Sequence, residues 1–321
     1  MASPTRCRVI ADEIDGSFVK NVLIVVLNYN KKDLLLECLA SLCGIEYPNY
    51  HVVVFDNASE DGSADAVARN YPELDLYRSD VNLGAIGGRN AAVEYGKTKY
   101  NFDYIMFLDD DAEITPKALT HLVEALEEDQ AAGIACGKTF VNIADRIIMS
   151  AGIRERFFFA VCYDRGAGVV DVGAYDSSCY VDACGAFAFL IRTDLFESLG
   201  GFDPKFSPYG FEDVDLCLRA RKRGIRTCYA HSAILVHKGT RVGRKPLASY
   251  EQNKIRNYLI LLARHMTLVQ KLCAIVTVPA RMVWLFVKFA KNGQWSMIPA
   301  QCRGALDYFM RRSWIAPVGK R

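Results

Sequence analysis

The sequence predicts an α/β protein with a doubly wound, mostly parallel central sheet and a C-terminal helical extension. Short β-branched runs alternate with amphipathic helical patterns over the first 130 residues, which is the order expected of a parallel sheet with helices on both faces. Residues 252–321 instead keep a helical, amphipathic pattern. The 321 residues suffice for one large domain with an appendage, and we expect three parts, 1–130, 131–250 and 251–321.

Four runs in the first part are typical of strands. Residues 21–27 (NVLIVVL) are almost continuously apolar, as in a strand buried on both faces. Residues 51–55 and 104–108 have the same character, and residues 74–78 form the remaining strand. We therefore expect a sheet of at least four parallel strands.

Helical patterns follow these strands. Residues 32–42 place their leucines on one stripe, and residues 64–70 and 91–95 lie in two further helices. Thr115 is a candidate N-cap, with Pro116 in the first turn of the next helix. Each helix would connect one strand to the next.

The middle part has weaker patterns. Residues 187–191 and 233–236 are typical of short strands, and residues 214–223 form one clear helix. We expect these elements to extend the same sheet.

Composition excludes several classes. The chain is 51% hydrophobic and 24% charged, so it is neither a disordered chain nor an integral membrane bundle. No C-x-x-C pair occurs among the eleven cysteines, which excludes zinc-ribbon and thioredoxin-type sites. The first twenty residues include Asp12, Glu13 and Asp15 and no long apolar run, so we expect no signal peptide and a cytoplasmic protein.

The charge is unevenly distributed. Residues 252–321 contain twelve Lys and Arg against one acid, Asp307, whereas residues 1–251 contain 27 Lys and Arg against 36 Asp and Glu. A basic tail on an acidic body suits a polyanionic partner, such as anionic lipid or nucleic acid. The sequence contains no nucleic-acid-binding module or stacking motif, so nucleic acid is not expected as a partner.

Residues 272–290 (LCAIVTVPARMVWLFVKFA) are the most apolar segment of the tail. They approach the ~20 residues that a membrane span needs, but Pro279, Arg281 and Lys288 interrupt them. We therefore expect a helix that lies in the interface of an anionic membrane, with contacts over residues 271–312. The alternative is an ordinary helix that docks on the rest of the protein.

Polar residues directly follow three of the predicted strands. Asn28, Asp56 and Asp109 each stand immediately after a strand. Ligands bind beyond the carboxyl ends of the strands in such sheets. We therefore expect these three residues to share one site.

Asp109, Asp110 and Asp111 form the sharpest local signal. Carboxylate oxygens bind Mg²⁺ or Mn²⁺, and such an ion can neutralise a diphosphate leaving group. The alternative is that these acids merely favour the start of the following helix through its dipole.

The segment from Asn82 to Asn90 is rich in glycine, with Gly84, Gly87 and Gly88 ahead of a predicted helix. Such turns let backbone N–H groups approach phosphates closely. The first glycine of G-x-G-x-x-G is missing, so a dinucleotide fingerprint is not supported. A purely structural turn remains the alternative.

Two further positions could carry chemistry. Glu212 and Asp213 precede the helix at 214–223, where a carboxylate could deprotonate an acceptor hydroxyl or simply favour the helix start. His237 closes the strand at 233–236, where it could bind a metal or make a surface hydrogen bond.

Taken in order, these segments resemble the family 2 glycosyltransferases with the GT-A fold, particularly their rhamnosyltransferase-like branch. Eight blocks match in family order over residues 21–240, about two thirds of the chain: VVLNYN (25–30), VFDNASEDGS (54–63), NLGAIGGRNAA (82–92), FLDDDAEI (107–114), GAFAFLIR (185–192), GGFDPKF (200–206), FEDVDLCLRARKRG (211–224) and VHKGT (236–240).

The resemblance implies roles at the donor site. The main chain around Asn28 and the Asp56 carboxylate would hold the nucleotide base. Asn82, Gly84 and Gly88 would face the ribose and the diphosphate.

The resemblance also implies a metal site. Asp109 and Asp111 would form the D-x-D element, with Asp111 the more direct ligand and Asp109 nearer the ribose. Asp110, which lies between these two residues, would contribute to the donor-binding site. His237 would be an additional ligand of the Mg²⁺ or Mn²⁺ ion.

The activity implied is a metal-dependent, inverting sugar transfer in cell-surface polysaccharide or glycoconjugate synthesis. Asp213 would be the general base, with Glu212 beside it orienting the acceptor. The donor would be a UDP- or dTDP-linked sugar, rhamnose among the candidates, and the acceptor a glycan or a lipid-linked saccharide. Parts 1–130 and 131–250 would bind donor and acceptor, at the cytoplasmic face of the cell membrane.

Two departures and two rival functions stay open. Arg89 stands where this branch often has Asn, and residues 206–211 form a longer run than usual. A catalytically inactive nucleotide- or carbohydrate-binding scaffold is one rival. A sugar nucleotidyltransferase is the other, although it would usually carry a Gly-rich basic loop where Asn28-Tyr29-Asn30 stands.

Overall fold

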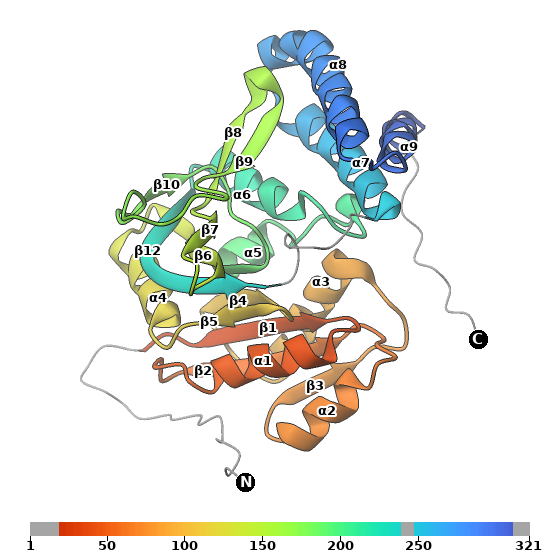
Figure 1. Ribbon diagram of the computed structural model, residues 1–321. Helices are drawn as coiled ribbons and strands as arrows, with labels where there is room; N and C mark the ends of the chain where they lie inside the picture. Colours follow the sequence, from red (N-terminus) through yellow and green to blue (C-terminus); the bar gives the residue numbers. More distant parts are fainter. Residues whose placement is uncertain (1–18, 239–246, 311–321) are drawn as a thin grey trace.

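The computed structural model describes residues 19–238 and 247–310 (Figure 1). Three of the sequence-based expectations fall on positions outside the described residues. These positions are the acidic N-terminal segment with Asp12, Glu13 and Asp15, the last two residues of the final matched block (239–240), and the tail beyond residue 310.

Ten strands of the described chain form one mixed sheet. Eight of them lie in the order β10-β12-β6-β11-β4-β1-β2-β3, while β5 pairs with β12 and β7 with β6. Their bounds are β1 Val22–Asn28, β2 Tyr50–Asp56, β3 Asp75–Arg78, β4 Tyr104–Asp109, β5 Ala112–Ile114, β6 Ala132–Asn142, β7 Ile147–Ser150, β10 Cys179–Val181, β11 Ala188–Arg192 and β12 Arg226–His237.

Most of these strands run in one direction. β3, β2, β1 and β4 are parallel neighbours, and β6 is parallel to β12. The antiparallel β11 lies between β4 and β6, so the two parallel groups share a direction. The predicted fold class, a mostly parallel α/β sheet followed by C-terminal helices, is confirmed.

The apolar strand runs are explained by two cores, one on each face of the sheet. Leu23 and Val25 of β1 face the core shared with helices α3 (Gly84–Lys97), α5 (Thr193–Ser198) and α6 (Glu212–Lys222). Val22, Ile24 and Val26 face the core shared with α1 (Lys32–Leu42), α2 (Ser63–Asn70) and α4 (Ala118–Glu128). Because helices cover both faces of the sheet at β1, this strand is apolar on both sides and does not alternate polar and apolar residues.

One predicted helix start is wrong. Helix α4 begins at Ala118, and its N-cap is Lys117 rather than Thr115. The Thr115 hydroxyl instead donates to the Ile234 carbonyl of β12, at 2.9 Å. The Thr115 hydroxyl is therefore bonded to β12, next to the β5–β12 pairing, and does not cap helix α4.

The strand predicted at 233–236 is only the end of the long β12, and no local sequence pattern predicts its partner β6. Lys138 interrupts the apolar pattern of β6, yet it is buried, with its ammonium 2.9 Å from Asp171. Gly137 lies where β12 bulges, and a Cβ there would meet the Ala233 carbonyl oxygen at 2.2 Å.

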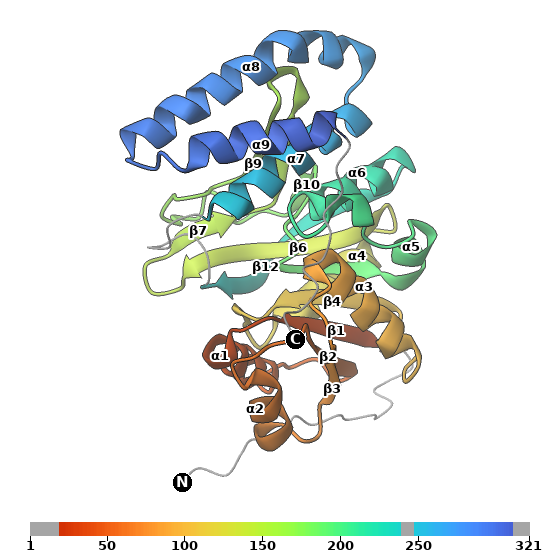
Figure 2. The same ribbon diagram turned by 90° about the vertical axis from the view of Figure 1, so that its right-hand side faces the viewer.

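Over residues 247–310 three helices follow the sheet: α7 (Ala248–His265), α8 (Leu268–Lys291) and α9 (Met297–Phe309). Helix α7 contributes Tyr258, Leu261 and Leu262 to one core and also packs against α9. Helix α8 lies at the edge of the molecule, beside the hairpin of β8 (Ile153–Arg156) and β9 (Val161–Asp164), as both views show (Figures 1 and 2). The division into 1–130, 131–250 and 251–321 stays a prediction.

Candidate functional site

The expected convergence at the sheet edge occurs for the three strand-end residues. β1 pairs with β2 and with β4, so Asn28 lies opposite Asp56, and Asp109 lies opposite the residue before Asn28. The buried Asn28 amide donates to Asp56 Oδ1 at 2.7 Å and to Ser59 Oγ at 3.0 Å. Asp56 Oδ2 accepts from the Ser59 N–H at 3.1 Å. Asn28 and Ser59 therefore fix the orientation of the Asp56 carboxylate.

Strand pairing also brings His237 to the acidic turn. After β4 the chain turns through Asp110 and Asp111 into β5, whose first residue, Ala112, pairs with His237. His237 Nε2 lies 2.8 Å from Asp111 Oδ1 and 4.0 Å from Asp109 Oδ2. One ligand atom from each of these three side chains lies within 4.8 Å of the others. Two carboxylates and an imidazole suit Mn²⁺ and can also hold Mg²⁺. We call Asp109, Asp111 and His237 the metal trio. Their ligand atoms fit such an ion.

Lys31 balances the charge of this turn. Its ammonium lies 2.7 Å from Asp110 Oδ1 and 2.7 Å from Asp111 Oδ2. Burial works to raise the pKa of Asp111, but its hydrogen bond with His237 and the Lys31 charge hold that pKa well below its usual range. Burial raises the pKa of Asp110 to about 6 against the opposing effect of Lys31. Asp110 also accepts from the Tyr29 N–H at 3.2 Å, so it points toward the β1 turn.

The acid pair stands in the first turn of α6, two residues earlier than the predicted helix start. Phe211, ahead of the helix, has a left-handed backbone with φ 68°. Asp213 Oδ1 accepts from the Val214 N–H at 2.7 Å, and Oδ2 accepts from the Ala186 N–H at 2.9 Å. Burial and the charge of Glu212 raise the pKa of Asp213 to about 7, although both N–H groups oppose the shift. The Asp213 residue as a whole is half-buried.

Arg89 connects the acid pair to the metal trio. Its buried guanidinium lies 2.6 Å from Asp109 Oδ1 and 3.0 Å from Glu212 Oε1. A Cβ at Gly88 would meet Leu27 Cδ1 at 2.5 Å, so a larger residue there would require the Leu27 side chain to shift. Arg89 departs from the family pattern in the sequence, but no local sequence pattern predicts its ion pairs or those of Lys31.

The other residues of the glycine turn build its shape. Asn82 Oδ1 accepts from the Gly84 N–H at 2.8 Å and from the Asn57 amide at 3.0 Å. Gly84 has φ +72°, and a Cβ there would lie 3.1 Å from the Pro208 backbone. Asn82, Gly84 and Gly88 thus have structural reasons for their identity, and the roles of all three toward a donor stay predictions.

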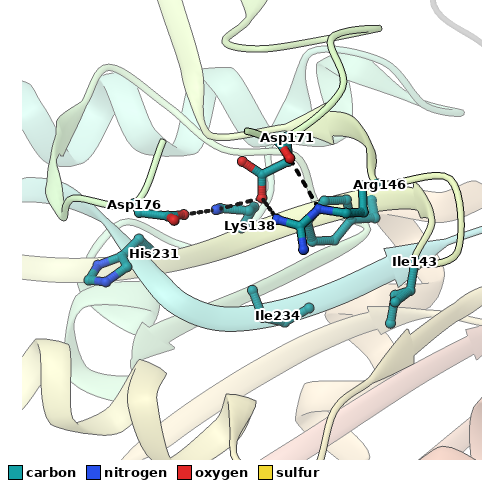
Figure 3. Close-up of a pocket in the computed structure, with 8 residues that line it drawn as sticks. Lys138, Ile143, Arg146, Asp171, Asp176, His231 and Ile234 are labelled. Atoms are coloured by element: carbon teal, nitrogen blue, oxygen red, sulfur yellow. Dashed lines mark hydrogen bonds and ion pairs between the residues drawn. The ribbon is translucent and has the colours of Figure 1, made fainter. Parts of the chain in front are cut away.

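A cavity of about 400 Å³ lies away from these acids, against β6 and β12 (Figure 3). Lys138 in its wall pairs with Asp171 and Asp176, and Arg146 lies 3.3 Å from Asp171. These charges already satisfy one another, and the metal trio and the acid pair do not line the cavity. The cavity is therefore separate from the metal trio and from the acid pair.

Comparisons with known proteins agree with this geometry. The family model described as Glycosyl transferase family 2 matches residues 23–174, and the one described as Glycosyl transferase family group 2 matches residues 104–317. Rhamnosyltransferase WbbL of Escherichia coli (strain K12) is 25% identical over 67% of this chain and 83% of its own. The N-acetylglucosaminyl-diphospho-decaprenol L-rhamnosyltransferase of Mycobacterium tuberculosis (strain H37Rv) is 25% identical over 75% of this chain and 84% of its own.

Two solved structures share the fold. The mannosyltransferase PcManGT from Pyrobaculum calidifontis, in complex with GDP-Man and Mn²⁺, has a TM-score of 0.59 at 16% identity, over 93% of this chain and 90% of its own. GalNAc-T7 with UDP, GalNAc and Mn²⁺ has a TM-score of 0.58 at 14% identity, over 77% of this chain and 48% of its own. At these identities the likeness is one of fold.

Proposed function

Because this chain belongs to glycosyltransferase family 2, we propose that it is a metal-dependent, inverting enzyme that transfers a sugar from a nucleotide-diphosphate donor to a hydroxyl acceptor. The observation that carries the proposal is the Arg89 bridge, in which one guanidinium joins Asp109 of the metal trio to Glu212 of the acid pair. A donor diphosphate at the trio would thereby present its sugar toward Asp213. Membership of the family makes the protein a glycosyltransferase with the GT-A fold.

Asp213 is proposed as the general base. Two backbone N–H groups fix its carboxylate, and a pKa of about 7 lets it be partly ionised and still basic at neutral pH. It would take the proton of the acceptor hydroxyl while the hydroxyl oxygen attacks the anomeric carbon from the face opposite the nucleotide. Glu212, held by Arg89, would orient the acceptor.

Asp109, Asp111 and His237 would hold the metal ion. A bound Mg²⁺ or Mn²⁺ would neutralise the charge that develops on the departing diphosphate. Lys31 keeps Asp110 and Asp111 charged and in place next to that position. The donor-holding roles of Asn28, Asp56, Asn82, Gly84, Gly88 and Asp110 are part of the proposal.

The nucleotide is proposed to be UDP or dTDP, with rhamnose a candidate sugar because two relatives carry rhamnosyltransferase names. The acceptor is proposed to be a glycan or lipid-linked saccharide, since the name of the mycobacterial relative includes a decaprenol-linked one. The synthesis served would be that of a surface polysaccharide or glycoconjugate. An inactive scaffold is disfavoured, because a mere binder needs no fixed, half-buried base such as Asp213.

A location at the cytoplasmic face of the membrane is proposed from the C-terminal helices. Among the described residues, α8 is the one helix long and apolar enough to cross a membrane by length and composition. Pro279 and Arg281 interrupt its apolar sequence, and α8 packs against the β8–β9 hairpin. We therefore favour peripheral attachment through the segment that begins at residue 271.

A thermal-shift panel tests the proposal. UDP, dTDP and GDP, each with Mn²⁺, Mg²⁺ or EDTA, would be compared on the full chain. A ligand that binds only the folded state adds about 2.7 kcal/mol of stability at a hundredfold excess over Kd. We expect one nucleotide to raise the Tm with metal and not with EDTA. If no nucleotide raises the Tm of the folded protein, an inactive binding scaffold would be favoured.

A further inference from the structure

Three consecutive phenylalanines form the tip of the β8–β9 hairpin. Phe157 is 2% exposed and anchors the tip in the core, whereas Phe158 is 53% and Phe159 is 65% exposed. These two adjacent phenylalanines expose apolar area that a membrane or another protein could cover.

Helix α8 packs against this tip (Figures 1 and 2), and its exposed apolar side chains continue the apolar surface. Of its residues only Phe289 is buried. Most of its exposed apolar side chains lie three, four or seven residues apart and so form one stripe: Leu268, Val269, Leu272, Ile275, Val276, Val283 and Val287.

Basic and indole side chains accompany this stripe. Helix α8 contains no acid, and Lys271, Lys288 and Lys291 are exposed along it. Arg156 is exposed directly before the hairpin tip, and Trp284 is 56% exposed. Apolar side chains with basic residues suit anionic lipid headgroups, and tryptophan favours the same interface.

We propose that Phe158, Phe159 and the α8 stripe together form a docking surface for a bilayer that contains anionic lipids. The hairpin tip is a second point of insertion, carried by the catalytic domain itself and not by the basic tail. Arg281 lies over the Tyr258 ring of α7, 5.5 Å from its centroid. This contact and the packing against the tip hold α8 along the molecule rather than across a membrane.

Tyr258 also connects the docking surface to the acid pair. Its hydroxyl donates to the Ala160 carbonyl, next to the hairpin tip. Its ring centroid is 5.7 Å from that of Phe211, which directly precedes Glu212. Tyr258 and Phe211 therefore connect the hairpin tip to the helix that carries the proposed base. Resting on the proposed function, the surface would bring a lipid-linked acceptor to Asp213 from the membrane side.

Co-sedimentation of the full chain with vesicles tests this inference without any sugar transfer. Phosphatidylcholine vesicles and phosphatidylcholine–phosphatidylglycerol vesicles would be compared. We expect binding that is stronger on the anionic vesicles and that is released by carbonate extraction. The Phe158→Ser/Phe159→Ser variant should bind about tenfold or more weakly, because it removes two inserting rings. The Ile275→Ser/Val276→Ser variant on α8 should weaken binding as well.

Val170→Ser/Val172→Ser is a matched control, since these exposed valines lie in a loop outside the surface. It should bind vesicles like the wild type, and the Tm of every variant checks its folding. Unchanged binding by the tip variant would overturn the inference, as would a wild-type protein that ignores both vesicles or resists carbonate. A dimer that dissociates on tip substitution would assign the surface to a second copy instead. Metal-dependent nucleotide binding, measured separately, shows whether the proposed function fails on its own.

Discussion

The Arg89 guanidinium donates to the Asp109 carboxylate, with 2.6 Å between Nη2 and Oδ1. The same buried group donates to Glu212 at 3.0 Å. Residues from α3, β4 and α6 therefore meet around a single cation. This arrangement couples the proposed metal side of the site to the proposed acceptor side, and it makes several expectations testable.

Arg89→Gln should impair both stability and turnover. Removing one partner from buried ion pairs typically costs about 3–5 kcal/mol, so the Tm should fall. The uncompensated charge of Glu212 should raise the pKa of Asp213 further, which moves the acid limb of the kcat–pH profile to higher pH. Arg89→Lys should recover part of both losses.

Arg78→Gln provides the control for Arg89. It removes an ion pair with Asp65 that is exposed, and such pairs contribute about 0–1 kcal/mol. An acid limb that stays in place in Arg89→Gln would contradict the coupling.

Asp111→Ala should weaken metal-dependent donor binding. Asp111 supplies the carboxylate nearest His237, so its loss removes one of three proposed ligands. Calorimetry of nucleotide binding with Mn²⁺ and with EDTA should show that the metal no longer adds affinity. Asp65→Ala, which removes an exposed carboxylate, should bind like the wild type. A full metal effect in Asp111→Ala would remove Asp111 from the ligand set.

The activity of the wild type should rise with pH through about 7. Below that pH the Asp213 carboxyl holds a proton and cannot accept another, because its pKa is raised to about 7. Its ordinary pKa in an unfolded chain is about 3.9. Between these values the folded state binds more protons, so ionisation of this carboxyl lowers stability as pH rises through the window. A kcat profile at saturating donor measures the first effect, and a limb near pH 4 would contradict it.

The Lys138 cluster should matter for stability alone. Lys138→Ala removes the ammonium from the buried Asp171 and leaves Arg146 as its remaining cation, so we expect a loss of about 1–3 kcal/mol. Thermal melts measure the loss, and nucleotide affinity should not change in the folded variant. A large affinity loss would make the cavity part of the donor site.

Elements with a strong local pattern could be predicted from the sequence. The run at β1 and the leucine stripe of α1 follow directly from burial on two faces and on one face. β6 could not be predicted in this way, because the buried Lys138 depends on Asp171 and Asp176 from a distant loop. Tertiary partners decide such positions, and a local pattern does not show them.

The residues of the candidate site likewise differ in whether a local sequence pattern predicts their placement. Placement of Asn28, Asp56 and Asp109 at one edge follows from strand ends alone. Pairing of β5 with β12 brings His237 to Asp111 across 126 residues of chain, and only the family resemblance anticipated it. The ion pairs of Arg89 and Lys31 depend on how helix α3 and the β1 turn pack, which no spacing in the sequence encodes.

Asp213→Asn tests the central claim most directly. Turnover and donor affinity would be measured on the same preparation, with the Tm as a check of folding. We predict that kcat falls by about 10²–10³ or more, the usual effect of losing a key polar group, while the Kd of the nucleotide with metal stays unchanged. Near-normal turnover with normal donor affinity would contradict the assignment of Asp213 as the base.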